Sequence, residues 1–404
     1  MKKNNYGYFE KYLKFIDLNN LYPEIHTVDG FSADPIVNIS GKEYLSFSTN
    51  NYLSLAKDNR ILKAVSDALP KYGVGSGSTR LLSGTLDIQI EFEKRLAKFF
   101  GYDNAITFSS GFLANVGVIR MLVDAFPYFK LPFLSDNGVI LSDELNHASI
   151  VDAVRLSKSD RFIYRHNDLD HLESLLKEYK NSRKLVITDG IFSMDGTEAK
   201  IFDLVNLCNK YNALLFVDDS HGVGVLGKKG RGVIEQLNTS DYPSVLMGSF
   251  TKAFGSLGGF VCINETLDKY LRITARSYIF SDPIPPILVA GLMEALNIIE
   301  NEEDRRNRAL SNANYLRNGF KQMNLKVLGD NSTIVPLIIG NEKKAMKFAR
   351  KLFDNDILAP CIRKPAVKEG SERIRFCVTT NHNREQLDKL LSISRIIAKD
   401  CGLN

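Results

Sequence analysis

The feature that most constrains the fold is an alternation of short apolar runs with stretches of helical periodicity, beginning near residue 85. Ile88, Phe92, Leu96 and Phe99 recur at helical spacing before Gly101, a residue type that commonly ends a helix. Helical stretches separate the apolar runs that follow, at residues 105–108, 139–141, 162–164, 185–188, 214–217 and 245–247. Strands that are apolar throughout are buried on both faces, so we predict an α/β domain with a mainly parallel sheet.

The alternation breaks at residues 282–286, where three prolines fall close together. The pattern beyond this break predicts the strands 334–339 and 374–378 and the helices 344–353 and 384–397. Such a mixture suits a small α+β domain. We therefore divide the chain into an N-terminal segment (1–55), a large domain (56–285) and a small C-terminal domain (286–404).

Composition excludes several functional classes. The net charge of +5 is spread over mixed-sign segments, so we expect neither nucleic acid nor an anionic membrane surface as a partner. No run of eighteen apolar residues occurs, which predicts no integral membrane segment. The five cysteines are scattered and odd in number, which favours reduced thiols over disulfides or a metal site and predicts a cytoplasmic location.

Polar residues that directly follow the predicted strands are the candidate ligand-binding residues, because ligands of open α/β sheets sit beyond the carboxyl ends of the strands. Ser109, Ser110, Gly111 and Phe112 follow the strand 105–108. They would present backbone N–H groups to a phosphate if a helix begins there. An ordinary helix cap is an equally good interpretation of these residues alone.

Asp218 and His221 follow the strand 214–217, and two buried ionisable groups need a partner of complementary charge or hydrogen bonding. The glycines Gly222, Gly224 and Gly227 in the same segment spell G-x-G-x-x-G, the fingerprint of nicotinamide-dependent dehydrogenases. We reject that interpretation because four polar residues separate the strand from the glycines and no helical pattern follows them.

Lys252 lies among small and apolar residues just after the strand 245–247. Desolvation lowers the pKa of a lysine and makes it able to form a Schiff base. A lysine of this kind is more often a surface loop residue. Its occurrence together with Asp218 and His221 at neighbouring strand ends favours a catalytic role.

Several longer motifs occur in order, and together they resemble the α-oxoamine synthases. These motifs are NNYL at residues 50–53, DELNHAS at 143–149, TDGIFSMDG at 188–196, VDDSH at 217–221 and SFTK at 249–252. The resemblance covers residues 37–391 and implies a fold type I transferase that depends on pyridoxal 5′-phosphate (PLP). This fold has a mainly parallel seven-stranded sheet in a large domain and a smaller α+β C-terminal domain.

The resemblance implies a role for each matched residue. Lys252 resembles the lysine that forms the Schiff base with the cofactor and later removes the Cα proton. Asp218 resembles the carboxylate paired with the pyridine nitrogen, and His147 the ring stacked on the cofactor. His221 and Ser193 match positions near the phenolic oxygen, where a donor disperses charge and orients the thioester carbonyl.

The remaining matches concern the phosphate and the substrate. The residues that resemble the phosphate cup are Ser249, Gly111 and Phe112. Asn50 and Arg375 resemble the groups that bind the substrate carboxylate, and Arg363 is a second candidate. Each arginine has an alternative role in a salt bridge between domains.

The implied reaction is a decarboxylative condensation of a small amino acid with an acyl thioester, carried by coenzyme A or an acyl carrier protein, to give an aminoketone. A homodimer with a shared active site is implied as well. Within the family, residues 336–340, 362–367 and 373–375 favour the subgroup that joins alanine to a pimeloyl thioester. A subgroup that condenses serine with a palmitoyl thioester, an acyl-carrier-protein-dependent synthase and a non-catalytic scaffold remain alternatives.

Three features depart from the family pattern. Gln89 replaces a frequent histidine near the thioester channel, and Asp282 lies where a serine or threonine of the second subunit is usual near the phosphate. Residues 124–134 form a longer and more aromatic segment than the family usually has. We interpret this segment either as a packed surface loop or as the lining of an acyl tunnel or a docking site for a carrier protein.

Overall fold

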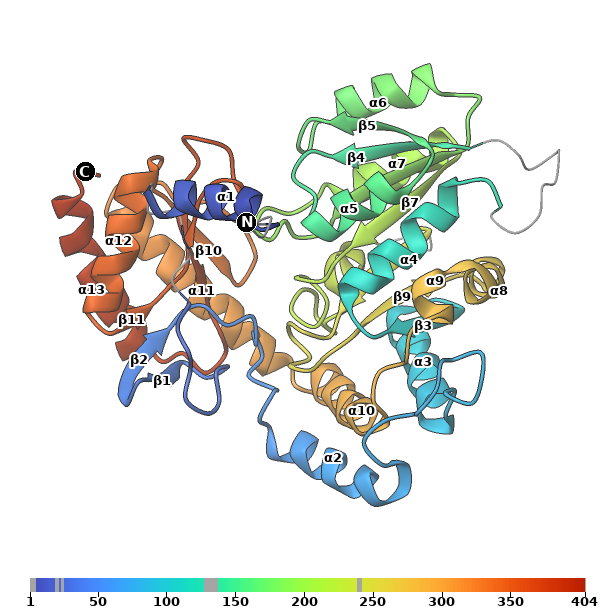
Figure 1. The fold of residues 1–404 in the computed structure, drawn as a ribbon, viewed down its shortest axis with the longest axis horizontal. Helices are drawn as coiled ribbons and strands as arrows, with labels where there is room; N and C mark the ends of the chain where they lie inside the picture. Colours follow the sequence, from blue (N-terminus) through green and yellow to red (C-terminus); the bar gives the residue numbers. More distant parts are fainter. Residues whose placement is uncertain (1–4, 19–21, 23–24, 127–136, 238–241, 404) are drawn as a thin grey trace.

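The computed structural model describes residues 5–18, 22, 25–126, 137–237 and 242–403, which form a larger and a smaller lobe (Figure 1). The strands are β1 (Ile36–Ile39), β2 (Lys42–Ser46), β3 (Asn104–Phe108), β4 (Val139–Asp143), β5 (Asp160–Tyr164), β6 (Lys184–Asp189), β7 (Ala213–Asp218), β8 (Val245–Ser249), β9 (Gly259–Ile263), β10 (Ile334–Ile338), β11 (Ile357–Leu358), β12 (Cys361–Ile362) and β13 (Arg373–Cys377).

The α-helices are α1 (Gly7–Leu18), α2 (Asn59–Tyr72), α3 (Asp87–Phe100), α4 (Gly111–Val123), α5 (Ala148–Leu156), α6 (Leu169–Glu178), α7 (Ile201–Lys210), α8 (Glu265–Thr274), α9 (Arg276–Ile279), α10 (Pro286–Asn301), α11 (Glu303–Gln322), α12 (Glu342–Asp354) and α13 (Arg384–Asp400). A short 3₁₀ helix, η2, spans Gly232–Gln236.

The larger lobe is built on a seven-stranded sheet in the order β3-β9-β8-β7-β6-β4-β5. Only β9 runs antiparallel to its neighbours in this sheet. The fold class predicted from the sequence, a mainly parallel seven-stranded sheet with a smaller C-terminal domain, is therefore confirmed.

Helices cover both faces of this sheet, which explains why its strands are apolar throughout. Leu185 and Ile187 of β6 belong to a core shared with α4, α5 and α8, whereas Val186 belongs to the core shared with α3, α6 and α7. Alternate residues of one strand point to opposite faces, so a single apolar run supplies both cores.

The smaller lobe contains two three-stranded sheets, β10-β13-β12 and β1-β2-β11. The N-terminal strands β1 and β2 thus join β11, from the other end of the chain. Phe47, Phe348, Phe376 and Leu387 lie in the core of this lobe.

The helices α10 and α11 follow one another between the lobes (Figure 1). Leu292 and Leu296 of α10 belong to the core of the larger lobe, whereas Leu316 and Phe320 of α11 belong to the core of the smaller one. The domain boundaries drawn from the sequence at residues 55 and 285 stay a prediction.

Two findings concern what the described part of the chain lacks. None of its helices is long and apolar enough to cross a membrane. The same residues contain no group of three or more histidine, cysteine or acidic side chains that could hold a metal ion.

Most of the aromatic segment 124–134 lies outside the described residues.

Candidate active site

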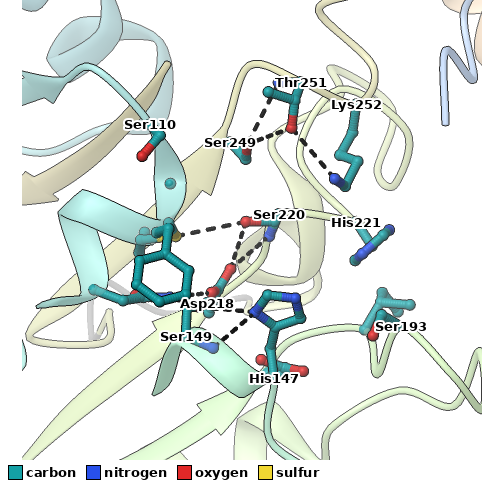
Figure 2. A pocket seen from close by; sticks show the side chains of 16 residues that line it. Ser110, His147, Ser149, Ser193, Asp218, Ser220, His221, Ser249, Thr251 and Lys252 are labelled. Carbon is teal, nitrogen blue, oxygen red and sulfur yellow. Dashed lines mark hydrogen bonds between the residues drawn. The ribbon is translucent and has the colours of Figure 1, made fainter. Parts of the chain in front are cut away.

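A cavity of about 230 Å³ opens where the chain leaves the carboxyl ends of the neighbouring strands β6, β7 and β8 (Figure 2). Polar side chains gather there because parallel strands all end at the same edge of the sheet. The residues predicted from the sequence that line this cavity are Ser110, Gly111, Phe112, His147, Ser193, Asp218, His221, Ser249 and Lys252.

Asp218, the last residue of β7, is buried and held by three donors. Its Oδ2 atom accepts a hydrogen bond from Asn115 Nδ2 at 2.8 Å, and Oδ1 accepts from the backbone N and the Oγ of Ser220 at 3.1 and 2.5 Å. A carboxylate fixed in this way can pair with a cationic ring nitrogen. Sequence reasoning missed Asn115, although it lies four residues after Gly111 and hence on the same face of α4.

Lys252 follows β8 in a short turn, and its Nζ atom donates to Thr251 Oγ1 at 3.2 Å. Burial lowers the pKa of Lys252, and the positive charge of Arg375 lowers it further, whereas Asp218 acts in the opposite direction. The amine is therefore more easily deprotonated than an ordinary lysine, as a nucleophile toward an aldehyde requires.

His147 caps the first turn of α5. Its Nδ1 atom lies 2.7 Å from Ser149 Oγ and accepts from the backbone N of Ser149 at 3.2 Å. Asn115 Nδ2 donates to the same Ser149 Oγ at 2.8 Å as well as to Asp218. The Asn115 amide thus connects Asp218 to Ser149, and through Ser149 to His147.

The start of α4 lies at the cavity, where the sequence predicts a phosphate cup. Ser110 caps this helix by accepting a hydrogen bond from the backbone N of Leu113 at 3.1 Å, and Ser249 lies opposite. A Cβ atom on Gly111 would lie 2.9 Å from Met247 Cε and 3.3 Å from Ser249 Oγ, so a side chain would crowd the cup. Free N–H groups at a helix start, close to hydroxyl groups, suit an anion such as phosphate.

Arg375 reaches the rim of the site from β13 of the smaller lobe. Its Nε donates to the backbone O of Ser193 at 2.5 Å, and one terminal nitrogen lies 3.4 Å from Asn50 Oδ1. The structure thus brings Asn50 and Arg375 together, adjacent to the cavity residue Ser193. Arg363 is not among the residues that line the cavity, and it forms an ion pair with Glu342 at 2.6 Å.

Two contacts at the site were not anticipated from the sequence. Asp189 lines the cavity and lies opposite Asp218 in the pairing of β6 with β7. Burial raises the pKa of Asp189, and the charges of Asp218 and Asp143 raise it further. His221 Nδ1 lies 2.7 Å from the hydroxyl of Tyr52, a residue 169 positions earlier in the chain. The search for polar residues at the ends of predicted strands could have found Asp189, whereas nothing in the sequence indicates the contact between Tyr52 and His221.

The departures from the family pattern have local explanations. Gln89 is buried, where its Oε1 accepts from the backbone N of Leu86 at 3.0 Å and its Nε2 donates to the backbone O of Ile284 at 3.3 Å. Asp282 is exposed. Ser109 Oγ donates a hydrogen bond to the backbone O of Asp282, not to its carboxylate.

The glycines of the G-x-G-x-x-G sequence form turns that lead into the 3₁₀ helix η2. Gly224 and Gly227 adopt positive φ angles of 82° and 84°. A dinucleotide fingerprint instead needs its glycines at the start of an α-helix. The structure therefore agrees with rejecting the dehydrogenase interpretation.

Comparison with known proteins agrees with this site. Residues 42–393 match the family model described as aminotransferase class I and II. A relative from Fervidobacterium nodosum named 8-amino-7-oxononanoate synthase is 39% identical over 388 residues, which is 95% of each chain.

Solved structures are similar over most or all of the chain. A structure of SPT with its PLP internal aldimine has a TM-score of 0.91 at 27% identity and covers 100% of both chains. An 8-amino-7-oxononanoate synthase structure from Francisella tularensis has a TM-score of 0.75 at 29% identity, over 88% of this chain and 98% of that one.

The fold, the lysine and carboxylate at neighbouring strand ends and the matched family model together define a class I and II aminotransferase fold. The chain belongs to this family and, within it, to the α-oxoamine synthases.

Proposed function

We propose that this chain is a PLP-dependent acyltransferase that condenses alanine with a pimeloyl thioester and releases carbon dioxide. This is the reaction of an 8-amino-7-oxononanoate synthase. The observation that carries the proposal is the full-length similarity to relatives of that name, combined with the cavity that holds Lys252, Asp218 and His147. The predicted roles of these residues form part of the proposal.

The residues of the cavity fit PLP group by group. The start of α4 and Ser249 would hold the phosphate, and the lack of a side chain at Gly111 leaves room for it. Asp218 would hold the ring nitrogen, His147 would lie against the ring, and Lys252 would bond to the aldehyde carbon. The donor set thus matches an anion, a cationic nitrogen and an electrophilic carbon.

When bound, PLP supplies an electron sink for the bond that breaks at the substrate Cα. The side chains of this protein supply the rest. Arg375, with Asn50 beside it, would bind the substrate carboxylate, for which a planar guanidinium is well shaped. Once displaced by the substrate amine, the Nζ of Lys252 would take the Cα proton, since its lowered pKa makes it available as a base.

Serine palmitoyltransferase activity is the second candidate, because SPT has the higher of the two TM-scores, 0.91 against 0.75. We favour the first candidate because sequence identity to 8-amino-7-oxononanoate synthases reaches 40%, whereas that to the SPT structures reaches 28%. An acyl carrier protein instead of coenzyme A as the thioester carrier remains part of the proposal to be tested.

We also propose a homodimer in the cytoplasm. Large apolar side chains are exposed on α2 and in the segment after it, at Leu62, Leu69, Val74, Leu81 and Leu82, which supports an association surface. The five cysteines are free, which supports a reducing compartment.

The test is a product assay on the PLP-loaded protein. Alanine, serine and glycine would each be paired with pimeloyl-CoA, pimeloyl carrier protein and palmitoyl-CoA, and products identified by mass spectrometry. We expect turnover to be fastest with alanine and a pimeloyl thioester. A preference for serine with palmitoyl-CoA would replace the first candidate by the second, and no product with any pair would reject both.

A further inference from the structure

The side-chain amide of Asn115 links three elements around the cavity. Asn115 lies on α4, lines the cavity and is fully buried. Its Nδ2 atom lies 2.8 Å from Oδ2 of Asp218 at the end of β7 and 2.8 Å from Oγ of Ser149 near the start of α5. Ser149 Oγ in turn lies 2.7 Å from His147 Nδ1. Asn115 therefore stands between Asp218 and His147, the two side chains proposed to contact the ring of PLP.

The chemistry of the groups sets the direction of each hydrogen bond. A carboxylate can only accept, so the atom of Asn115 that faces Asp218 must be Nδ2, which also donates to Ser149 Oγ. A backbone N–H can only donate, and that of Ser149 donates to His147 Nδ1 at 3.2 Å. This ring nitrogen therefore carries no proton and accepts the hydroxyl proton of Ser149 as well. The hydrogen bonds thus run from Asn115 to Asp218 directly and to His147 through Ser149.

The folded protein holds this amide at a cost. Asn115 Oδ1 is buried and has no hydrogen-bond partner in the part of the chain that the structure describes. An unsatisfied buried oxygen destabilises the folded state, whereas an apolar side chain of similar size, such as leucine, would leave nothing unsatisfied. Packing alone does not account for an amide at this position, so its contribution lies in the two hydrogen bonds that Nδ2 donates.

We propose that Asn115 is a positioning residue that orients Asp218 and His147 together. It holds the Asp218 carboxylate directly and His147 through the hydroxyl of Ser149. Loss of this one amide would therefore disturb both side chains that are proposed to contact the cofactor ring. The hydrogen bonds are independent of the proposed function, whereas their effect on PLP rests on it.

The first test is ¹⁵N NMR of the full-length, cofactor-free protein labelled at its six histidines. The His147 signals would be assigned from their loss in His147→Gln. We expect no proton on His147 Nδ1 in the unmodified protein. Ser149→Ala removes the hydroxyl and should shift the Nδ1 signal, and Asn115→Ala should shift it in the same direction. Combining the two substitutions should add no further shift, because Asn115 acts on His147 through Ser149.

Asn312→Ala is the matched control. Asn312 Nδ2 also donates to two acceptors, the backbone O atoms of Thr379 and His382 at 3.3 and 2.7 Å, but Asn312 does not line the cavity. This variant should leave the His147 signals unchanged. A proton on Nδ1 in the unmodified protein, an unchanged Nδ1 signal in Asn115→Ala, or additive shifts in the double variant would overturn the proposal. The first of these results decides the matter even if no variant folds.

The second test is PLP binding by the same variants, measured by fluorescence titration. Asn115→Ala loses the contacts to both Asp218 and Ser149, so its dissociation constant should rise by about 10-fold or more, as for loss of a hydrogen bond to a charged group. Ser149→Ala should show a smaller rise, and Asn312→Ala none. An unchanged dissociation constant in Asn115→Ala, or an equal rise in Ser149→Ala, would overturn the proposal.

The two tests separate this inference from the proposed function. The NMR measurement uses no PLP, and the binding measurement uses no amino acid or acyl thioester. If the unmodified protein binds no PLP, the proposed function is rejected and the NMR result alone decides the role of Asn115.

Discussion

At the scale of single residues, burial sets the chemistry of the site. Burial and the charge of Arg375 disfavour the positive charge of the half-buried Lys252, whereas Asp218 is buried but held by three donors. Both were predicted from the sequence because Asp218 directly follows one apolar strand and Lys252 lies a few residues after another. The assignment of Arg363 as a second carboxylate-binding candidate stays a prediction, and nothing in the sequence indicated its ion pair with Glu342 at 2.6 Å. Contacts between distant segments, such as Tyr52 with His221, depend on the packing of the lobes.

The lowered pKa of Lys252 predicts how its reaction with PLP depends on pH. Only the neutral amine attacks an aldehyde, so the reactive fraction should rise with pH through the pKa of Lys252. Because burial and Arg375 lower that pKa from its ordinary value of 10.5, the midpoint should fall below 10.5. The measurement is the rate of borohydride-trapped PLP incorporation against pH, with N-acetyl-lysine amide as the reference compound. A midpoint equal to that of the reference would contradict the prediction.

Asp218→Asn should preserve the shape of the site but remove the charge expected to pair with the cofactor ring. We expect turnover to fall by about 10²-fold or more, the range typical for loss of one preorganised electrostatic partner. Steady-state kinetics and PLP retention after dialysis would measure the effect. Asp203→Asn, in the exposed first turn of α7, is the control and should leave both unchanged. Normal turnover by Asp218→Asn would contradict the proposal that the Asp218 carboxylate pairs with the cofactor ring.

At the scale of elements, hydrophobic patterning identified most strands of the larger lobe but not all of them. The strand β9 was missed because it begins at Gly259, a residue type with low strand propensity, and its place between β3 and β8 is fixed by tertiary pairing. The strand β5 begins at residue 160, two residues before the apolar run. The polar residues Asp160 and Arg161 are tolerated because β5 is the edge strand.

The start of α4 combines a helix cap with the proposed phosphate cup, and these two functions can be separated. Ser110→Ala removes the capping hydrogen bond to Leu113 and should lower the free energy of unfolding by about 1 kcal/mol. Asn341→Ala, which removes the equivalent cap of α12 in the smaller lobe, should have a similar cost. Only Ser110→Ala should also weaken PLP binding, as measured by fluorescence titration. Equal PLP affinity in the two variants would place the phosphate elsewhere.

At the scale of the whole molecule, the two lobes meet beside the site through ion pairs of different burial. Arg373 contacts Asp195 at 2.8 Å with its side chain only 4% exposed, whereas Lys368 contacts Glu144 at the same distance with its side chain 74% exposed. Sequence patterning predicted two domains but gave no information on these contacts. The contribution of β1 and β2 to the smaller lobe was equally hidden, because β11, the partner of β2, lies more than 300 residues later.

Breaking the buried pair should destabilise the protein far more than breaking the exposed one. Arg373→Met leaves Asp195 without its cation and should lower the free energy of unfolding by about 3 kcal/mol. Lys368→Met should lower it by about 1 kcal/mol or less, since solvent already screens that pair. Urea unfolding of the two variants would compare these costs. Equal costs would contradict the inference that the buried contact dominates this part of the lobe interface.

The most direct test of the central claim is the visible absorption spectrum of the full-length protein after incubation with PLP. The account predicts an absorption band that borohydride removes, and that alanine shifts at a lower concentration than serine or glycine. Lys252→Ala should lack the borohydride-sensitive band, and Lys229→Ala, an exposed lysine in the glycine-rich segment, should retain it. Absence of the band from the unmodified protein, or its persistence in Lys252→Ala, would contradict the claim that Lys252 holds the cofactor in this cavity.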